Sequence, residues 1–187
     1  GTQARSARQR SALPRRSHGS PPHAFRRAVG LCIVNDDGSR VMVAERLDER
    51  GVYQMPQGGI DVGESPLEAA LRELEEETGL PPNAVEALGE SERWLCYHHP
   101  GGLTVRNCFG REIYFVGQAQ RWFLLRLNVP DSQVNLGSVA SPEFAGWRWA
   151  AWDEVAPGTV CFKRELYEQV IATLEPIARA RGLAGRA

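Results

Sequence analysis

Three glutamates in this chain are spaced so that their carboxylates share one side of a helix. Glu73, Glu76 and Glu77 stand at positions i, i+3 and i+4, which are neighbours on a helix surface. Like charges at this spacing destabilise a helix by roughly 0.2–0.5 kcal/mol per pair, so we expect a cation to compensate them. Oxygen ligands suit Mg²⁺, which keeps several waters and bridges carboxylates to substrate phosphates, and Mn²⁺ suits the same ligands. The chemistry implied is phosphoryl or pyrophosphoryl transfer to water.

A glutamate-rich helix can also be no more than a solvated face, but the residues around this one favour a site. Gly58 and Gly59 precede the helix and would let the backbone bend tightly and approach a ligand. Glu64 could form an ion pair with Arg72 and so fix the preceding loop on the helix. These residues are ordered along the chain as one loop-helix-loop unit.

The helix that carries the glutamates has clear boundaries in the sequence. Ser65 followed by Pro66 is a helix-start pair, and Gly79 follows Thr78 as a stop signal. Four apolar residues fall at helical spacing and are expected to form the buried stripe, with the acidic residues covering the remainder. These apolar residues are Leu67, Ala70, Leu71 and Leu74.

Strands and a second helix surround this unit. Residues 29–34 and 40–44 are β-prone segments separated by a turn signal, which predicts a β-hairpin. Residues 122–127 and 147–152 have the composition of strands, and residues 162–178 have the pattern of a closing helix. Strands interleaved with two long helices predict an α/β sandwich.

The composition is that of an ordinary globular domain with an unusual N-terminal end. Of 187 residues, 42% are apolar and 24% are charged, and no apolar run approaches the ~18 residues of a membrane span. The net charge of −1 hides an uneven distribution, because residues 1–27 hold seven arginines and no acidic residue. The remainder has 15 basic and 23 acidic residues (22 − 7 = 15), a net charge of −8.

The division that we expect is a basic arm at residues 1–24, a folded domain at 25–180 and a tail at 181–187. An arm rich in arginine and serine and free of acids has the composition of an organelle transit peptide. A solvated linker and a basic arm that contacts RNA phosphates are the alternatives.

Residues 58–80 resemble a complete Nudix box, G-x5-E-x7-R-E-U-x-E-E-x-G-U with U apolar. The match covers every fixed position, namely Gly58, Glu64, Arg72, Glu73, Leu74, Glu76, Glu77, Gly79 and Leu80. The resemblance implies a Nudix α/β/α sandwich with a mixed β-sheet, in which the three glutamates bind the metal. Gly58, Gly59, Glu64, Arg72 and Gly79 would then have structural roles.

Further segments resemble the Nudix subgroup of RNA pyrophosphohydrolases and dinucleoside polyphosphate hydrolases, over about residues 25–178. The segments that carry this likeness are residues 53–60, 94–97, 117–125, 142–149 and 162–164.

The subgroup's pattern points to additional site residues. It implies that Glu143 is a further metal ligand or the general base, although Glu76 could also serve as the base. It places Arg26 at a phosphate and Phe162 against the base, although Phe162 could equally be an anchor of the last helix. Lys163 and Arg164 are further phosphate candidates, or else solvated basic residues.

The substrate expected first is a dinucleoside polyphosphate, with diadenosine tetraphosphate cleaved to ATP and AMP. The folded part is acidic and carries few cations near residues 94–99, which disfavours long RNA because RNA affinity depends on phosphate neutralisation. An RNA 5′ end and guanosine tetraphosphate are the alternative substrates. The intact box argues against a binding module without activity, and the plant-type resemblance together with the arm suggests a chloroplast enzyme. The sequence predicts no membrane and leaves the oligomeric state open.

Overall fold

A mixed β-sheet holds the molecule together. The computed structural model describes residues 23–107, 109–137 and 140–184, so most of the expected arm and the last residues of the expected tail lie outside the described part. The strands are β1 (Phe25–Val34), β2 (Arg40–Arg46), β3 (Tyr53–Gln54), β4 (Gln57–Gly59), β5 (Val85–Glu90), β6 (Leu95–Arg106), β7 (Glu112–Leu127) and β8 (Phe144–Ala151). The helices are α1 (Pro66–Thr78), α2 (Trp152–Val155) and α3 (Arg164–Ala184), with short 3-10 turns η1 (Pro82–Ala84), η2 (Asp131–Gln133) and η3 (Cys161–Lys163).

The centre of the sheet is the parallel pair β1 and β7, in register from Phe25 opposite Gly117 to Val34 opposite Arg126. All the other strand pairs are antiparallel: β4 and β2 pair with β1, β5 and β6 pair with β7, and β3 and β8 pair with β2. The predicted hairpin of β1 and β2 is present, and the mixed sheet is confirmed.

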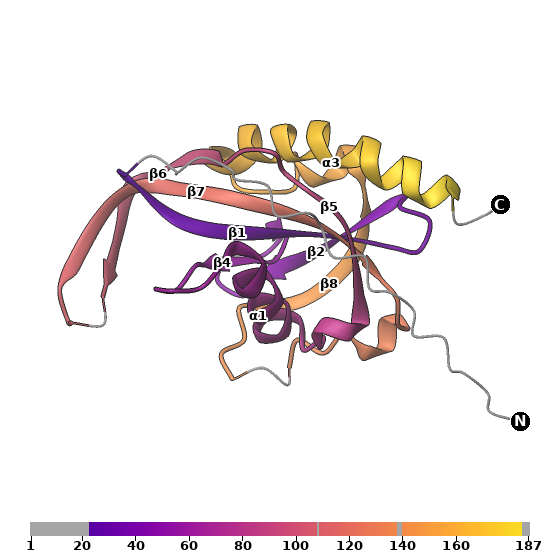
Figure 1. Ribbon diagram of the computed structural model, residues 1–187, viewed down its shortest axis with the longest axis horizontal. Coiled ribbons are helices and arrows are strands. Elements are labelled where there is room, and N and C mark those ends of the chain that lie inside the picture. Colours follow the sequence, from indigo (N-terminus) through magenta and orange to yellow (C-terminus); the bar gives the residue numbers. More distant parts are fainter. Residues whose placement is uncertain (1–22, 108, 138–139, 185–187) are drawn as a thin grey trace, which may run out of the picture.

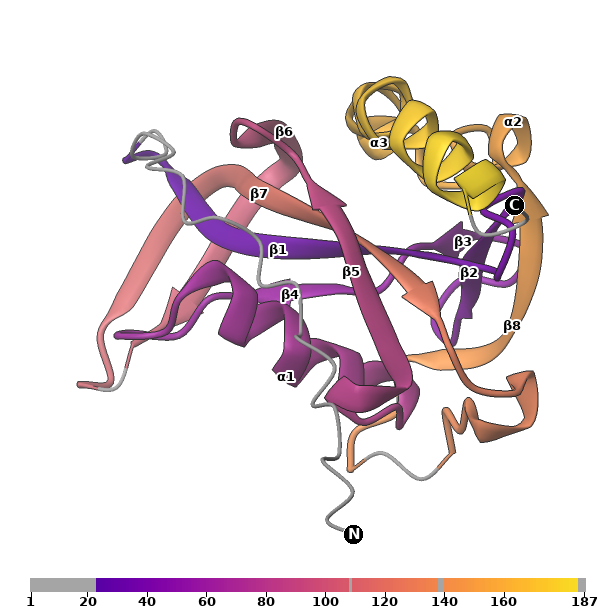
Figure 2. The same ribbon diagram turned by 45° about the vertical axis from the view of Figure 1, so that its right-hand side comes forward.

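Helices cover both faces of this sheet, with α1 on one side and α3 on the other (Figures 1 and 2). Successive side chains of a strand point to opposite faces, so the central strands contribute to two separate cores. Leu31 and Phe123 pack in the core with α1, whereas Cys32 and Trp122 pack in the core with α3. A strand buried on both faces explains the unbroken apolar run at the end of β1.

Helix α1 has the boundaries that its sequence predicts, but its buried face is different. The Ser65 hydroxyl accepts a hydrogen bond from the Glu68 backbone, and the Glu68 carboxylate accepts one from the Ser65 backbone, which completes a capping box. The prediction that Leu67 and Leu71 are buried is wrong, because Leu67 is 41% exposed and Leu71 is only half-buried. The residues that face inward are Ala69, Ala70, Glu73, Leu74, Glu77 and Thr78.

The buried face of α1 lies where it does because β1 and β4 pass close beneath it. The backbones are so close that only small side chains such as those of Ala69 and Ala70 fit between them. The carboxylates of Glu73 and Glu77 face strand β4, which contains glycines. Apolarity alone therefore predicts the wrong side of this helix.

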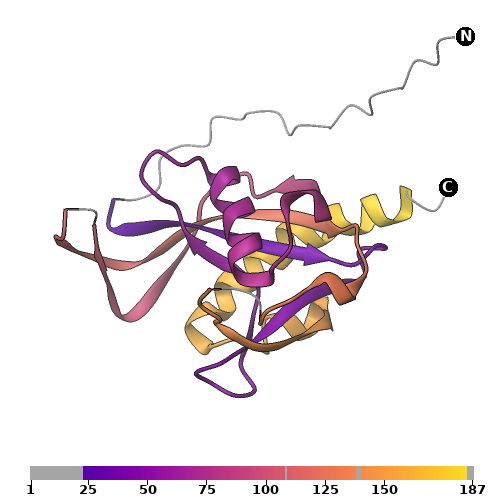
Figure 3. The same ribbon diagram turned by 90° about the horizontal axis from the view of Figure 1, so that it is seen from below.

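The C-terminal elements begin and end differently from the sequence prediction. Trp152 starts the short helix α2 instead of ending a strand, and its indole donates a hydrogen bond to the Gly38 carbonyl at 3.0 Å. The closing helix starts at Arg164, since Phe162 lies in η3, and it continues to Ala184. The hairpin of β6 and β7, which the sequence did not predict, projects beyond the sheet (Figure 3). Among the described helices, none is long and apolar enough to cross a membrane.

Replacing Ser65 by Ala should destabilise the fold through α1. The substitution removes the hydroxyl that caps the helix, so we expect the free energy of unfolding to fall by about 1 kcal/mol. Urea denaturation followed by circular dichroism would measure the change. The exposed Ser132→Ala is the control and should stay within about 0.5 kcal/mol of the parent protein; equal effects of the two substitutions would contradict the prediction.

Candidate active site

The Arg72 guanidinium connects helix α1 to the loop that precedes it. Its Nε and Nη2 donate to the two carboxylate oxygens of Glu64 at 2.9 and 3.0 Å, and Nη2 also donates to the Gly59 carbonyl at 2.8 Å. The expected ion pair of Glu64 with Arg72 is therefore present and bidentate, a geometry that fixes direction as well as distance. Hydrogen bonding to Arg72 holds the pKa of the Glu64 carboxyl below its usual value.

The same guanidinium also orients two of the three helix carboxylates. Its Nη1 donates to Glu73 Oε1 at 2.7 Å and to Glu76 Oε2 at 3.0 Å. Arg72 therefore neutralises part of the charge on the acidic side of α1 and ties that side to Gly59.

Two glycines of the box are required by close contacts and a third by its backbone conformation. A Cβ on Gly58 would lie 1.9 Å from the Glu73 carboxyl carbon, and one on Gly59 would lie 2.1 Å from Nη2 of Arg26. Gly79 ends α1 with a φ of 69°, and its N–H donates to the Glu75 carbonyl. A side chain at these positions would displace a functional group or strain the backbone.

The three helix glutamates differ in exposure. Glu73 and Glu77 are buried, whereas the Glu76 side chain is 57% exposed. Glu77 Oε2 accepts a hydrogen bond of 2.8 Å from the Gln57 backbone N–H. Burial raises the pKa of the Glu77 carboxyl well above its usual value, with a further contribution from the charge of Glu143. Burial is also the main cause of the raised pKa of Glu73.

Glu143 lies with these glutamates although it is far from them in sequence. The loop before β8 brings it to a hollow of about 630 Å³ whose lining includes Glu73, Glu76, Glu77, Ser141 and Glu143. Its charge contributes to the raised pKa values of Glu73 and Glu77. The structure thus gathers the four glutamates that the sequence analysis named as metal ligands or as the base.

The chemistry of this hollow fits a hard divalent cation. Its acidic side chains offer carboxylate oxygens, and two of these side chains are buried where an unpaired charge is costly. Within the described ranges, no three Asp, Glu, His or Cys side chains converge closely enough to hold an ion by themselves. That arrangement is compatible with Mg²⁺, which is commonly bound by one or two carboxylates together with waters and substrate phosphates.

A buried cation lies on the other side of Gln57 from Glu77. Lys163 is only 4% exposed, and its Nζ donates to Gln57 Oε1 at 3.0 Å. Burial, together with the nearby charge of Arg46, lowers the pKa of Lys163 to about 8. Its ammonium also lies 5.3 Å from the centre of the Tyr97 ring.

Phe162 belongs to an aromatic cluster next to this lysine. Its ring stacks with Tyr97 at a centroid distance of 6.0 Å and an interplanar angle of 29°, and it meets the edge of His99 at 5.1 Å. Phe162 is half-buried, so it packs against the core of α3 and still keeps exposed surface. Both readings of this residue made from the sequence are compatible with that position.

Arg26 and Arg46 complete the set of cations around this region. The half-buried Arg26 lies on β1 opposite Gln118 of β7, with its guanidinium beside Gly59. Arg46, at the end of β2, pairs with Asp48 and donates to Gln54 Oε1 at 3.4 Å. Its charge affects the pKa of both Lys163 and Tyr97, which places it near the lysine.

Sequence reasoning missed Arg46, Gln57 and Tyr97 as members of this region. Gln57 and Tyr97 fall inside segments that carried the family likeness, so that likeness was the available signal for them. Arg46 has no such signal, because only the course of β2 brings its side chain towards Lys163.

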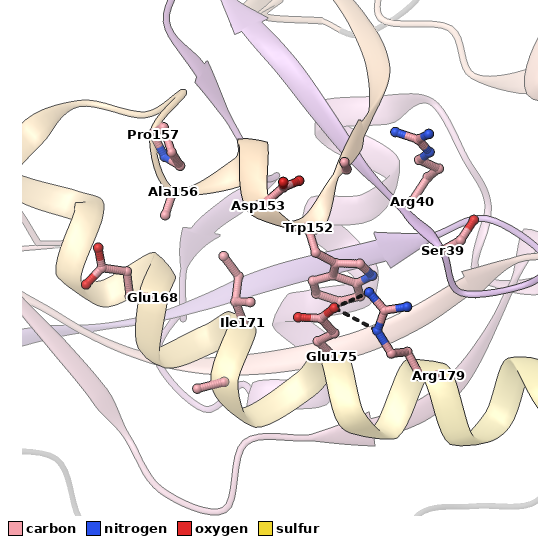
Figure 4. Close-up of a pocket in the computed structure, with 12 residues that line it drawn as sticks. Ser39, Arg40, Trp152, Asp153, Ala156, Pro157, Glu168, Ile171, Glu175 and Arg179 are labelled. Carbon is pink, nitrogen blue, oxygen red and sulfur yellow. Dashed lines mark hydrogen bonds and ion pairs between the residues drawn. The ribbon is translucent and has the colours of Figure 1, made fainter.

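A second hollow, of about 810 Å³, lies between α2 and α3 (Figure 4). Trp152 and Ile171 line it, and Glu175 and Arg179 of α3 bind each other across one turn beside it. None of the four carboxylates of the candidate site lines this hollow.

Comparison with known proteins matches the NUDIX domain model to residues 24–170. An RNA pyrophosphohydrolase of Rhodospirillum rubrum is 47% identical over 154 residues, covering 82% of this chain and 89% of that protein. Nudix hydrolase 25 of Arabidopsis thaliana is 41% identical, covering 88% and 94% respectively. The same plant's Nudix hydrolase 26, which is chloroplastic, is 39% identical, covering 82% and 70%.

Solved structures share the fold at lower identity. The Escherichia coli dihydroneopterin triphosphate pyrophosphohydrolase has a TM-score of 0.57 and 22% identity, covering 79% of this chain and 97% of that chain. A binary complex of the Caenorhabditis elegans Ap4A hydrolase has a TM-score of 0.55 and 21% identity, covering 80% and 98%. These likenesses confirm the predicted α/β fold.

Replacing Arg72 by Lys should destabilise the protein despite the conserved charge. A lysine cannot reproduce the bidentate contact to Glu64 together with the bond to Gly59, so we expect the free energy of unfolding to fall by about 1–3 kcal/mol. Urea denaturation gives the value. Arg106→Lys, at an exposed pair with Glu112, is the matched control with an expected effect below about 0.5 kcal/mol. A loss at Arg72 no larger than at Arg106 would show that its geometry is dispensable.

Proposed function

The chain belongs to the Nudix family of hydrolases, and on that premise we propose that it cleaves a phosphoanhydride bond in a nucleotide that carries a polyphosphate chain. One observation carries the proposal. Gln57 contacts a buried carboxylate, Glu77, through its backbone and a buried cation, Lys163, through its side chain. Gln57 of β4 therefore connects the carboxylate that would bind the metal, on α1, with the cation that would bind phosphate, in η3.

Glu73, Glu76 and Glu77 are the residues that would hold Mg²⁺, and Mn²⁺ suits the same oxygen ligands. When bound, the metal would lower the pKa of the attacking water and neutralise phosphate charge. The raised pKa of Glu77 supports this assignment, since a buried carboxylate with no ion pair among the described residues favours its protonated form.

We assign the proton-accepting role to Glu143. A general base must lie within reach of the attacking water, and Glu143 enters the hollow from the loop opposite α1. Glu76, the other candidate, already accepts a hydrogen bond from Arg72 at 3.0 Å. Arg72 and Glu64 hold the loop and do not act on the substrate in this scheme.

The substrate would extend from the carboxylates to the aromatic cluster. Lys163 and Arg26 would bind phosphate oxygens and offset the charge that develops on the leaving phosphate. Phe162, stacked with Tyr97, offers a ring face to a base, and stacking of this kind accepts any base. The arrangement provides for one base and a phosphate chain.

Two substrates fit this description, and different observations favour them. The name of the Rhodospirillum relative and of others at 42% identity supports the triphosphorylated 5′ end of RNA, which we place first. The net charge of −8 beyond residue 27 favours a small dinucleoside polyphosphate such as diadenosine tetraphosphate, which we keep as the second candidate.

A chloroplast location is also a proposal. It is supported by the composition of the arm at residues 1–24 and by the chloroplastic relative. The Rhodospirillum relative is bacterial, and imaging of a fluorescent fusion would test the location of this protein.

Initial rates with a short triphosphorylated RNA and with diadenosine tetraphosphate would test the activity. We expect cleavage of at least one of them with Mg²⁺ and none with a chelator, with pyrophosphate or phosphate released from RNA, or ATP and AMP from the dinucleotide. Glu77→Gln should lower kcat by about 100-fold or more, while Glu112→Gln, on the projecting hairpin, should have no effect. Normal turnover by Glu77→Gln would overturn the metal assignment.

The pH dependence of kcat/KM should show the titration of Lys163. Its pKa is lowered to about 8, so the free enzyme loses this positive charge as the pH rises through about 8, and kcat/KM should fall there. The charges of Arg46, Glu77 and Glu143 act on the ammonium, and the Tyr97 ring lies beside it. The pKa of Tyr97 is raised to about 12, so its titration falls outside this pH range. Lys163→Arg keeps its charge at every pH in the assay and should remove this decline. An unchanged profile would rule out Lys163 as its source.

A further inference from the structure

Lys163 is the single lysine of this chain, which otherwise uses arginine for all its basic side chains. It is also buried, at 4% exposure, and in the described part of the chain no carboxylate lies within ion-pair distance of its Nζ. The polar partner of this ammonium is the side-chain amide oxygen of Gln57, at 3.0 Å. A buried cation held by a neutral acceptor instead of a carboxylate is uncommon in proteins.

Gln57 is itself held in one orientation. Its Oε1 accepts a second hydrogen bond of 3.0 Å from Gln120 Nε2, which also donates to Gln118 Oε1 at 2.9 Å. Gln120 is fully buried and Gln118 nearly so, hence the acceptor cannot turn away from the lysine without breaking this chain of amides. On its other side, the Gln57 backbone N–H donates to Glu77 at 2.8 Å.

The choice of an amide at position 57 has a chemical consequence. An amide oxygen accepts a hydrogen bond from the ammonium and fixes its direction, but it leaves the positive charge uncompensated. A carboxylate at the same position would pair with the ammonium and compete with any anionic ligand. The two remaining N–H groups of Nζ have no hydrogen-bond acceptor among the described residues, which leaves them for an anionic ligand in the proposal below.

We propose that Gln57 is a positioning residue that holds the charged Lys163 for a phosphate chain and sets its place relative to the metal-binding carboxylate Glu77. The proposal deepens the proposed function, on which it rests for the nature of the ligand. Gln57 acts through Lys163 and need not touch the substrate. Since its contact with Glu77 is made by the backbone, side-chain substitutions leave that contact in place and disturb the contacts with Lys163 and Gln120.

Two substitutions test different properties of the side chain at position 57. One adds a negative charge, and the other removes the hydrogen-bond acceptor. In Gln57→Glu, a carboxylate replaces the amide, so the pKa of Lys163 should rise and affinity for inorganic tripolyphosphate with Mg²⁺ should fall by about tenfold or more. In Gln57→Met, the acceptor is lost at similar size, so the pKa of Lys163 should fall and the affinity should drop by about three- to tenfold.

The single lysine allows a direct measurement of this effect. Lysine labelled with ¹³C and ¹⁵N, incorporated into the full chain carrying no lysine-containing tag, gives one side-chain NMR signal whose titration reports the pKa of Lys163. Calorimetry with tripolyphosphate reports the affinity of the same samples. Gln169→Glu on α3, a similarly half-buried glutamine away from the amide chain, controls for the added negative charge.

The decisive comparison is a double-mutant cycle with Lys163→Met. If Gln57 acts through the lysine, Gln57→Glu should weaken tripolyphosphate binding in the parent but change it less than about twofold in the Lys163→Met background. An unchanged Lys163 titration and affinity in Gln57→Glu, or equal losses in both backgrounds, would overturn the proposal. A protein that cleaves no nucleotide yet shows these shifts would sink the proposed activity and leave the role of Gln57 standing.

Discussion

The site depends on the hydrogen bonds and ion pairs that the Arg72 guanidinium makes. This guanidinium joins the Glu64 carboxylate, the Gly59 carbonyl and the helix carboxylates Glu73 and Glu76. Without it, the loop after β4 would be free of α1, and several carboxylates would face one another without compensation. Because a planar guanidinium offers its donors in fixed directions, this one side chain sets both the distance from loop to helix and the orientation of the acids.

Close packing around that contact imposes a further constraint. Gly58 lies so near Glu73 that no side chain fits between them, and Gly59 is equally close to Arg26. As a result, strand β4 runs directly between the carboxylates of α1 and the cations on the opposite side of the sheet. The glycines thus let the strand pass between groups of opposite charge without a side chain of its own at these two positions.

This arrangement carries a cost in the metal-free protein. Burial raises the pKa of Glu77, so the folded state holds its proton more tightly than the unfolded chain does. The metal-free fold is therefore expected to lose stability as the pH rises from the ordinary glutamate pKa to the raised one, and a bound cation would restore it. Lys163 shows the converse, since its lowered pKa makes its burial least costly at alkaline pH. A bound cation would compensate the charge of Glu77, and a bound phosphate would compensate the charge of Lys163. Ligand binding would therefore stabilise the fold.

The sequence by itself determined the local structure of the loop and helix α1. The helix start at Ser65, the stop at Gly79 and the pair of Glu64 with Arg72 all lie within a few turns, so local hydrogen bonding and spacing are enough to predict them. It also predicted the mixed α/β fold, through the family likeness and the order of strands and helices.

Only the tertiary structure decided which face of α1 is buried and which distant residues join the site. The apolar pattern favoured Leu67 and Leu71, but the close passage of β1 and β4 buries Glu73 and Glu77 instead. Gln57 meets Lys163 across 106 positions of the chain, and Arg46 reaches the same region from β2. No local preference encodes such contacts, because they follow from the register of strands and from the packing of α3 on the sheet.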